Sequence, residues 1–187
     1  MAIDKRRIES AICEVLKAIG EDPQRQGLID TPSRVADMFA EIFAGYSQDP
    51  EGVIKIFEEA EVSEGIVTVK NIPFYSMCEH HLMPFFGEVH IAYIPKNKKI
   101  LGLSKFARVV GVFSKQLQIQ EKLTAQIANF LYDKIDAKGI VVLVQATHLC
   151  VTMRGAKSFG SKTETMQIKG IFREKEELLQ QALCLLK

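Results

Sequence analysis

The feature that most constrains the fold is a change in the spacing of apolar residues near Gly65. Before it, apolar residues recur at the three-and-four spacing of an amphipathic helix over residues 8–19, after Thr31-Pro32, and less clearly over 51–59. Thr31 is expected to be an N-cap, with Pro32 as the first helical residue. Residues 1–60 are therefore predicted to form a helical segment, which could pack on a neighbouring chain as easily as on its own core.

Beyond Gly65 the pattern predicts strands with helices between them. Because the strands come in groups, the fold class is expected to be α+β with a mainly antiparallel sheet, in a second domain over residues 61–187. Strands are predicted over 66–69, 88–94, 100–103, 140–147 (continuing through 148–154) and 163–172, and helices over 104–117, 121–135 and 174–186.

Composition narrows the possible partners. Of the 187 residues, 47% are hydrophobic and 25% are charged, which is typical of a globular protein. The net charge of +1 provides no electrostatic case for nucleic acid or for an anionic membrane. Neither a signal peptide nor a membrane-spanning apolar run is apparent, so the four cysteines are expected to be reduced thiols in the cytoplasm. Cys13 and Cys184 lie in apolar periodic segments and are expected to be packing residues.

Two short segments hold three of the four histidines and two of the four cysteines: Cys78-Glu79-His80-His81 and His148-Leu149-Cys150. Thiolate and imidazole are zinc ligands, and three protein ligands with an open fourth position are typical of a catalytic zinc. Adjacent histidines rarely bind the same ion. One of His80 and His81 is therefore expected to transfer protons, together with His148.

If residues 148–154 form a strand, then His148, Cys150, Thr152 and Arg154 share one face. The alternative is an ordinary strand with its polar side in water, but such a face more often carries Glu, Lys and Thr than His and Cys together. His90 lies in the middle of a predicted strand and is expected to be structural or exposed.

Cations at a predicted helix start suggest an anion site. Ser104, Lys105 and Arg108 would lie where free N–H groups favour phosphate, although a solvated basic helix face explains them equally well. Residues 155–163 nearly match a phosphate-binding P-loop, but the extra Ser161 and the strand pattern that follows exclude it. Glu121, at another helix start, is either a capping acid or a reader of a guanine edge; the residues alone do not decide.

Residues 78–81, 102–105, 118–124 and 146–155 together closely resemble the motifs of the GTP cyclohydrolase I family, with similarity running from about residue 31 to residue 174. The resemblance implies a tunnelling fold, an antiparallel sheet with helices on one face. It further implies that sheets join into a barrel in a homodecamer of two pentamers, with active sites at subunit interfaces. The implied reaction is zinc-dependent opening of the guanine imidazole ring of GTP at C8, release of formate, and closure to 7,8-dihydroneopterin triphosphate.

The resemblance also implies a role for each matching residue. The zinc ligands would be Cys78, His81 and Cys150. The catalytic groups would be His80, His148 and Ser104. The substrate-binding residues would be Gln120 and Glu121 for guanine, and Lys105, Arg108, Arg154 and, more weakly, Arg34 for the ribose and triphosphate.

Departures from the family pattern lie outside the metal and base motifs. These departures are expected to affect substrate affinity and subunit packing. They are Gly111, Gln116, Glu164 and Met166.

Two other hypotheses for the function are another tunnelling-fold enzyme acting on a related nucleotide, and a non-catalytic zinc-stabilised ring. The missing His-x-Glu and Pro-Cys-x-x-Cys signatures argue against a cytidine-type deaminase.

Overall fold

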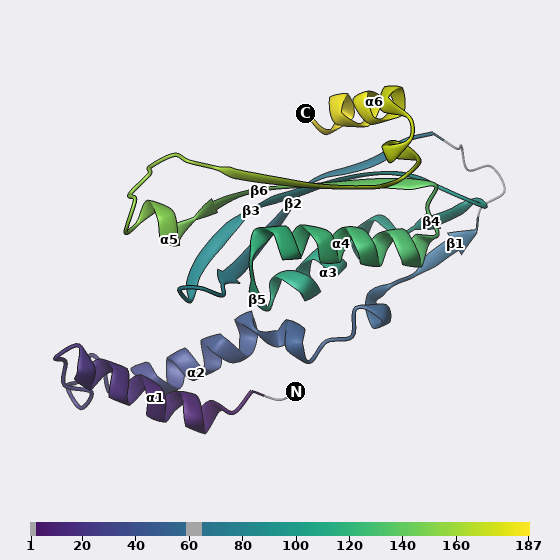
Figure 1. Ribbon diagram of the computed structural model, residues 1–187. Coiled ribbons are helices and arrows are strands. Elements are labelled where there is room, and N and C mark those ends of the chain that lie inside the picture. Colours follow the sequence, from purple (N-terminus) through teal and green to yellow (C-terminus); the bar gives the residue numbers. More distant parts are fainter. Residues whose placement is uncertain (1–2, 59–64) are drawn as a thin grey trace.

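The computed structural model describes residues 3–58 and 65–187 and is built around a five-stranded sheet (Figure 1). The strand order is β5-β2-β3-β6-β7, antiparallel throughout except that β5 runs parallel to β2. The strands are β2 (Val67–Cys78), β3 (Met83–Ile94), β5 (Leu117–Gln118), β6 (Gly139–His148) and β7 (Thr163–Gly170). The predicted α+β class with a mainly antiparallel sheet is confirmed.

Two helices, α3 (Leu103–Ser114) and α4 (Gln120–Ile135), cover one face of the sheet and bury the larger core. The last helix, α6 (Glu176–Leu186), packs on the opposite face through a smaller cluster that includes Ala92, Val141 and Phe172. A short turn of 3-10 helix, η3 (Ile171–Arg173), connects β7 to α6. The expectation of helices on one face only is therefore wrong, because β3 and β6 bury apolar residues on both faces at this end.

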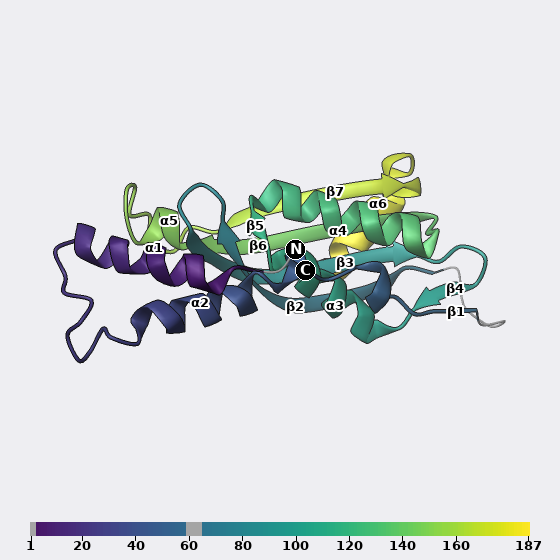
Figure 2. The same ribbon diagram turned by 90° about the horizontal axis from the view of Figure 1, so that it is seen from below.

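The amino-terminal part forms a helix pair, α1 (Lys5–Ala18) and α2 (Thr31–Ile42), that extends away from the sheet (Figures 1 and 2). The N-cap of α2 is Asp30 and not Thr31. Two 3-10 turns follow, η1 (Ala44–Tyr46) and η2 (Glu51–Val53). The predicted helix over 51–59 is wrong beyond η2, because β1 (Ile56–Glu58) pairs with β4 (Lys99–Leu101). The predicted domain boundary at residue 60 lies outside the described residues.

The predicted strand over residues 148–154 is also wrong. Strand β6 ends at His148, and α5 (Leu149–Thr152) is a single helical turn. The partner strand β3 begins at Met83, and Phe85 already pairs with His148, so a longer β6 would soon have no ladder to join. The backbone instead forms a hydrogen bond within the segment: Met153 N donates to Leu149 O at 2.9 Å, as in a helix. None of the described helices is both long enough and apolar enough to cross a bilayer.

Candidate metal and active site

The turn between β2 and β3 presents the first group of candidate ligands. Cys78 is the last residue of β2 and is 4% exposed, so its thiol is fixed by the core. Residues 79–82 form the turn, in which Leu82 N donates to Cys78 O at 2.9 Å and Leu82 adopts a positive φ of 50°. His80 and His81 are exposed on this turn. A buried ligand is thus followed at once by two accessible imidazoles.

The helical turn α5 brings Cys150 to this place. Its Sγ lies 3.9 Å from Cys78 Sγ, and His81 Nδ1 lies 4.0 Å from the same sulfur. The ligand atoms of Cys78, His81 and Cys150 all lie within 4.8 Å of one another. Two sulfurs each about 2.3 Å from a tetrahedral zinc lie about 3.8 Å apart, so the thiol pair fits a zinc ion closely.

His80 is placed differently from His81. Its Nδ1 also lies 4.0 Å from Cys78 Sγ, but His80 is not a member of the group that meets Cys150. The two imidazole rings are nearly perpendicular, with an interplanar angle of 87°. All three expected zinc ligands therefore converge on one point, and His80 lies beside them.

His148, at the end of β6, lies between an aromatic ring and an amide. Its imidazole stacks on Phe85 with a centroid distance of 4.6 Å and an interplanar angle of 3°. Its Nε2 lies 2.8 Å from Gln120 Oε1. Burial lowers the pKa of His148, while the charge of Glu121 acts to raise it. The result is a neutral imidazole in a fixed plane near the thiols.

The thiol of Cys150 is held in its neutral form when no metal is bound. Burial raises its pKa, and the neighbouring Cys78 adds to this effect, while the charge of Arg154 acts to lower it. A thiolate in this environment therefore needs a cation, as a metal site with two cysteine ligands provides.

Two expected substrate-binding residues differ sharply in exposure. Gln120, the first residue of α4, is 1% exposed and bonded to protein, whereas the next residue, Glu121, is exposed. Arg154 follows α5 and is exposed beside Cys150. The free carboxylate and guanidinium both lie on the metal-site end of the molecule.

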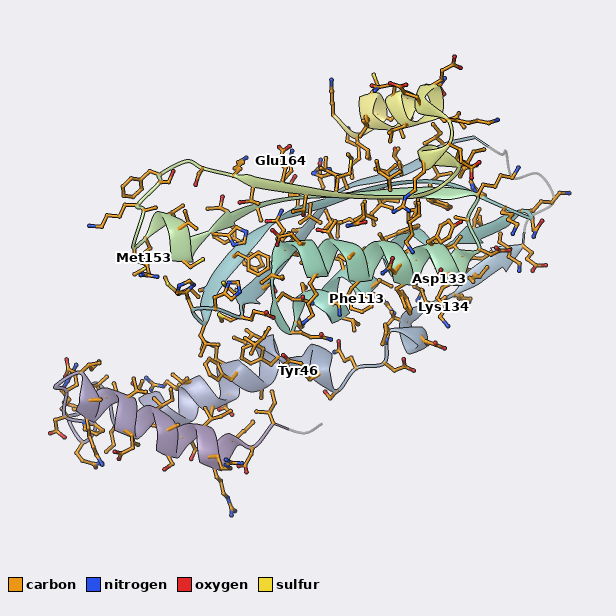
Figure 3. The ribbon with its side chains drawn as sticks, in the orientation of Figure 1. Tyr46, Phe113, Asp133, Lys134, Met153 and Glu164 are labelled. Atoms are coloured by element: carbon orange, nitrogen blue, oxygen red, sulfur yellow. The ribbon has the colours of Figure 1, made fainter. Side chains whose placement is uncertain are left out.

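The remaining expected residues lie elsewhere in the chain. The first half of α3 holds Ser104, Lys105 and Arg108. Just before this helix, the backbone N–H of Gly102 donates to Lys55 O, next to β1. Gly102, not Ser104, is the N-cap of this helix. Figure 2 shows β1 and β4 at the opposite end from α5, and Figure 3 shows Met153, just after α5, far from Lys134 near the end of α4.

Arg34 belongs to the amino-terminal helix pair. It lies on α2 and forms an exposed ion pair with Asp30 at 2.9 Å. One chain thus assembles the metal and proton-transfer groups but not the cations of α2 and α3.

Three residues of the site had not been expected. Phe85 stacks on His148, and Thr124 and Thr165 bond to each other and to Gln120. An aromatic residue in a strand and two threonines carry no sequence signal of such a role, because only the packing of α4 on β6 and β7 brings them together.

Comparison with known proteins agrees with this geometry. The family model described as GTP cyclohydrolase I matches residues 8–187. The chain is 52% identical over 184 residues to GTP cyclohydrolase 1 of Caldanaerobacter subterraneus subsp. tengcongensis, covering 98% of this chain and 97% of that protein. It is 50% identical over 184 residues to GTP cyclohydrolase 1 of Streptococcus mutans, covering 98% and 95%.

A solved structure of the archaeosine synthase QueF-Like in the apo form has a TM-score of 0.44 and 17% identity, and covers 58% of this chain and 97% of that one. This likeness is too low to support an argument. The sequence relatives and the family model are decisive instead: the chain belongs to the GTP cyclohydrolase I family.

Proposed function

We propose that this chain opens the imidazole ring of GTP at C8 in a zinc-dependent hydrolysis, releases formate, rearranges the ribose and closes the ring to 7,8-dihydroneopterin triphosphate. This would be the first step of pterin and tetrahydrofolate biosynthesis. The observation that carries the proposal is the convergence of Cys78, His81 and Cys150 beside His148, in a chain about half identical to proteins named GTP cyclohydrolase 1.

Cys78, His81 and Cys150 would hold the zinc ion. A zinc ion with three protein ligands and an open position polarises a carbonyl and lowers the pKa of bound water toward 7. The donor set fits this ion because soft thiolates and imidazole prefer zinc to magnesium or calcium. The rest of the reaction depends on side chains that bind, orient or move protons.

Proton transfer would fall to the two histidines of the site that are not ligands, His80 and His148. His148, held neutral by burial, can accept a proton and return it to a nitrogen of the opening ring. His80 is exposed beside Cys78, where it can serve the later ribose rearrangement. The exposed carboxylate of Glu121 can accept two hydrogen bonds from the ring N–H and exocyclic amine of guanine.

The triphosphate would be bound by cations and would not react. Arg154 is close to the metal cluster, whereas Lys105 and Arg108 would come from a neighbouring chain. Ser104, on the same helix as these two cations, would assist His80 in the ribose rearrangement. We propose a cytoplasmic homodecamer of two pentamers, with residues 1–60 serving assembly and residues 61–187 carrying the site; neither nucleic acid nor membrane is a partner. Binding energy from the triphosphate would then position the base for reaction.

The test is GTP turnover by purified, zinc-loaded protein, measured as formate release and as pterin fluorescence after oxidation. We expect formate and pterin in equal amounts. Cys150→Ser should lose both activities and most of its zinc. Cys184→Ser, which changes an exposed cysteine on α6, is the matched control and should retain zinc and turnover. Intact GTP in the presence of a full zinc complement would refute the proposal.

A further inference from the structure

The side chain of Gln120 is enclosed by protein. It is 1% exposed, at the junction where β5 ends and α4 begins. A primary amide in such a place is costly unless its donors and acceptor are all bonded. The identity of its partners therefore shows what the residue does.

The amide nitrogen of Gln120 faces three acceptors. Nε2 lies 2.9 Å from Val144 O, 3.0 Å from Thr163 O and 3.1 Å from Thr165 Oγ1. The first two are carbonyl oxygens, which only accept. If the amide were turned over, its oxygen would face both of them without a hydrogen between, so only one orientation of the amide is compatible with the surroundings.

The neighbouring threonines complete a consistent network. Thr124 Oγ1 donates to Gln120 O at 2.7 Å and lies 2.6 Å from Thr165 Oγ1. Thr165 then donates to Thr124 and accepts from the Gln120 amide, so every hydroxyl hydrogen has one acceptor. Neither threonine can donate to Gln120 Oε1, which is left with His148 as its partner.

The orientation of the amide fixes that of the imidazole. Gln120 Oε1 is only an acceptor and lies 2.8 Å from His148 Nε2, so Nε2 must carry a hydrogen. Stacking on Phe85 keeps the ring in its plane. The neutral ring is then the Nε2–H tautomer, and Nδ1 holds the lone pair.

We propose that Gln120 is a positioning residue: its amide oxygen keeps a hydrogen on Nε2 of His148 and thereby makes Nδ1 the nitrogen that exchanges protons with the substrate. The proposal rests on the proposed function only for the identity of that substrate. It assigns to Gln120 a different role from the guanine contact expected from the sequence, since the amide has no free donor to offer. Recognition of the base is left to Glu121.

The direct test is 15N nuclear magnetic resonance of the zinc-loaded protein labelled only in histidine, at a pH where the rings are neutral. The chain has four histidines, so His148→Asn assigns the relevant pair of signals. We expect Nε2 of His148 to give the signal of a nitrogen that carries hydrogen, and Nδ1 that of a bare nitrogen. The opposite pattern in the unaltered protein would overturn the proposal without any further variant.

A pair of variants separates positioning from folding. Gln120→Met keeps the length of the side chain but removes the acceptor, and should give His148 a mixture of tautomers. Gln118→Met is the matched control: Gln118 is equally buried, donates to Phe113 O and to Gln126, and should leave the His148 signals unchanged. Zinc content and melting temperature of both variants report on their folding.

Kinetics provide the second measurement. Gln120→Met should lower kcat by about tenfold to a hundredfold, as expected for impaired acid–base catalysis, with KM for GTP changed less than about twofold. A raised KM with unchanged kcat and unchanged His148 signals would show that Gln120 binds the base instead. Without any GTP turnover in the parent protein, the proposed function fails, and the tautomer measurement still decides the role of Gln120.

Discussion

At the scale of single residues, the chain keeps two imidazoles neutral by burial and fixes each by one hydrogen bond. His148 donates from Nε2 to Gln120, whereas His90 accepts at Nδ1 from the backbone N–H of Asn71 at 3.3 Å. Both rings therefore carry their hydrogen on Nε2. In the described part of the chain, Nε2 of His90 has no hydrogen-bond partner, since the Glu88 carboxylate is 3.8 Å away.

The burial of His90 predicts a dependence of stability on pH. Burial lowers its pKa, Lys70 acts in the same direction, and Glu88 and Glu164 act to raise it. In the unfolded chain the ring takes up a proton near pH 6.5, whereas in the folded chain it stays neutral to a lower pH. The free energy of unfolding should therefore fall as the pH drops below about 6.5, with a slope approaching about 1.4 kcal/mol per pH unit from this residue.

Urea unfolding of the parent and of His90→Asn from pH 8 to pH 5 measures this contribution. Asparagine keeps an acceptor for the Asn71 N–H but does not titrate, so its stability should fall less steeply with decreasing pH. Zinc release and the titration of His148 affect both proteins alike, and the difference between them isolates His90. Equal slopes in the two proteins would contradict the prediction.

The identities of the site residues were more predictable than their surroundings. The sequence motifs led to the expectation that Cys78, His81 and Cys150 would converge, and the structure brings these residues together. The burial of Gln120 was not predictable, because it results from contacts with β6 and β7, more than twenty positions along the chain. Residue type indicates possible chemistry, whereas its availability depends on packing.

At the scale of elements, the close pairing of β3 with β6 depends on a residue without a side chain. Gly87 pairs with Ala146, and a Cβ at this position would overlap the backbone oxygen of Gln145. The strands would have to separate just two residues from Phe85, which stacks on the His148 imidazole. Here the geometry of the sheet and that of the site are coupled.

Gly87→Ala should therefore lower the free energy of unfolding by about 3 kcal/mol, since the new methyl meets backbone that cannot rotate away. Gly111→Ala is the control: it lies in α3, where an added Cβ meets open space, and should raise stability by about 0.5–1 kcal/mol. Thermal unfolding of both variants measures the two effects. Similar melting temperatures for the two variants would refute the proposed crowding at Gly87.

Long helices were predicted better than the limits of strands. The apolar pattern of α4 is a local signal, and this helix begins one residue before its predicted start and ends at its predicted end. By contrast, β2 and β3 extend well beyond the predicted strands over 66–69 and 88–94. The alternation of His148, Cys150 and Thr152 favoured a strand but is present in a helical turn. Alternation alone does not make a strand where the partner strand ends, and the position of that end depends on the β2–β3 turn, distant in sequence.

At the scale of the whole molecule, the expected site residues lie at two ends. The metal cluster lies by α5, whereas Ser104 and Lys105 lie at the start of α3 beside β1 and β4. From Ser104 to Ser114, α3 alone separates the two ends by about 15 Å. The proposed interface sites require that the two groups which meet one GTP molecule come from different chains.

This arrangement predicts complementation between two inactive variants. Cys150→Ser removes a metal ligand, and Lys105→Ala removes a cation from the other end. Each pure variant has the same defect in every site and should be nearly inactive. If each site combines the metal cluster of one chain with the α3 start of another, random mixing of equal amounts leaves about one quarter of the sites with both halves intact.

Co-expression of the two variants, followed by measurement of formate release per chain, tests the prediction. Activity should return to about a quarter of the parent value for random assembly at equal amounts. Mixing Cys150→Ser with His81→Asn is the control: both changes affect the metal cluster, so every site retains a defect and activity should stay at the level of the single variants. If activity returns only in the first mixture, each site must combine residues of two chains. If activity does not return in a mixed assembly of verified composition, both groups of one site belong to a single chain.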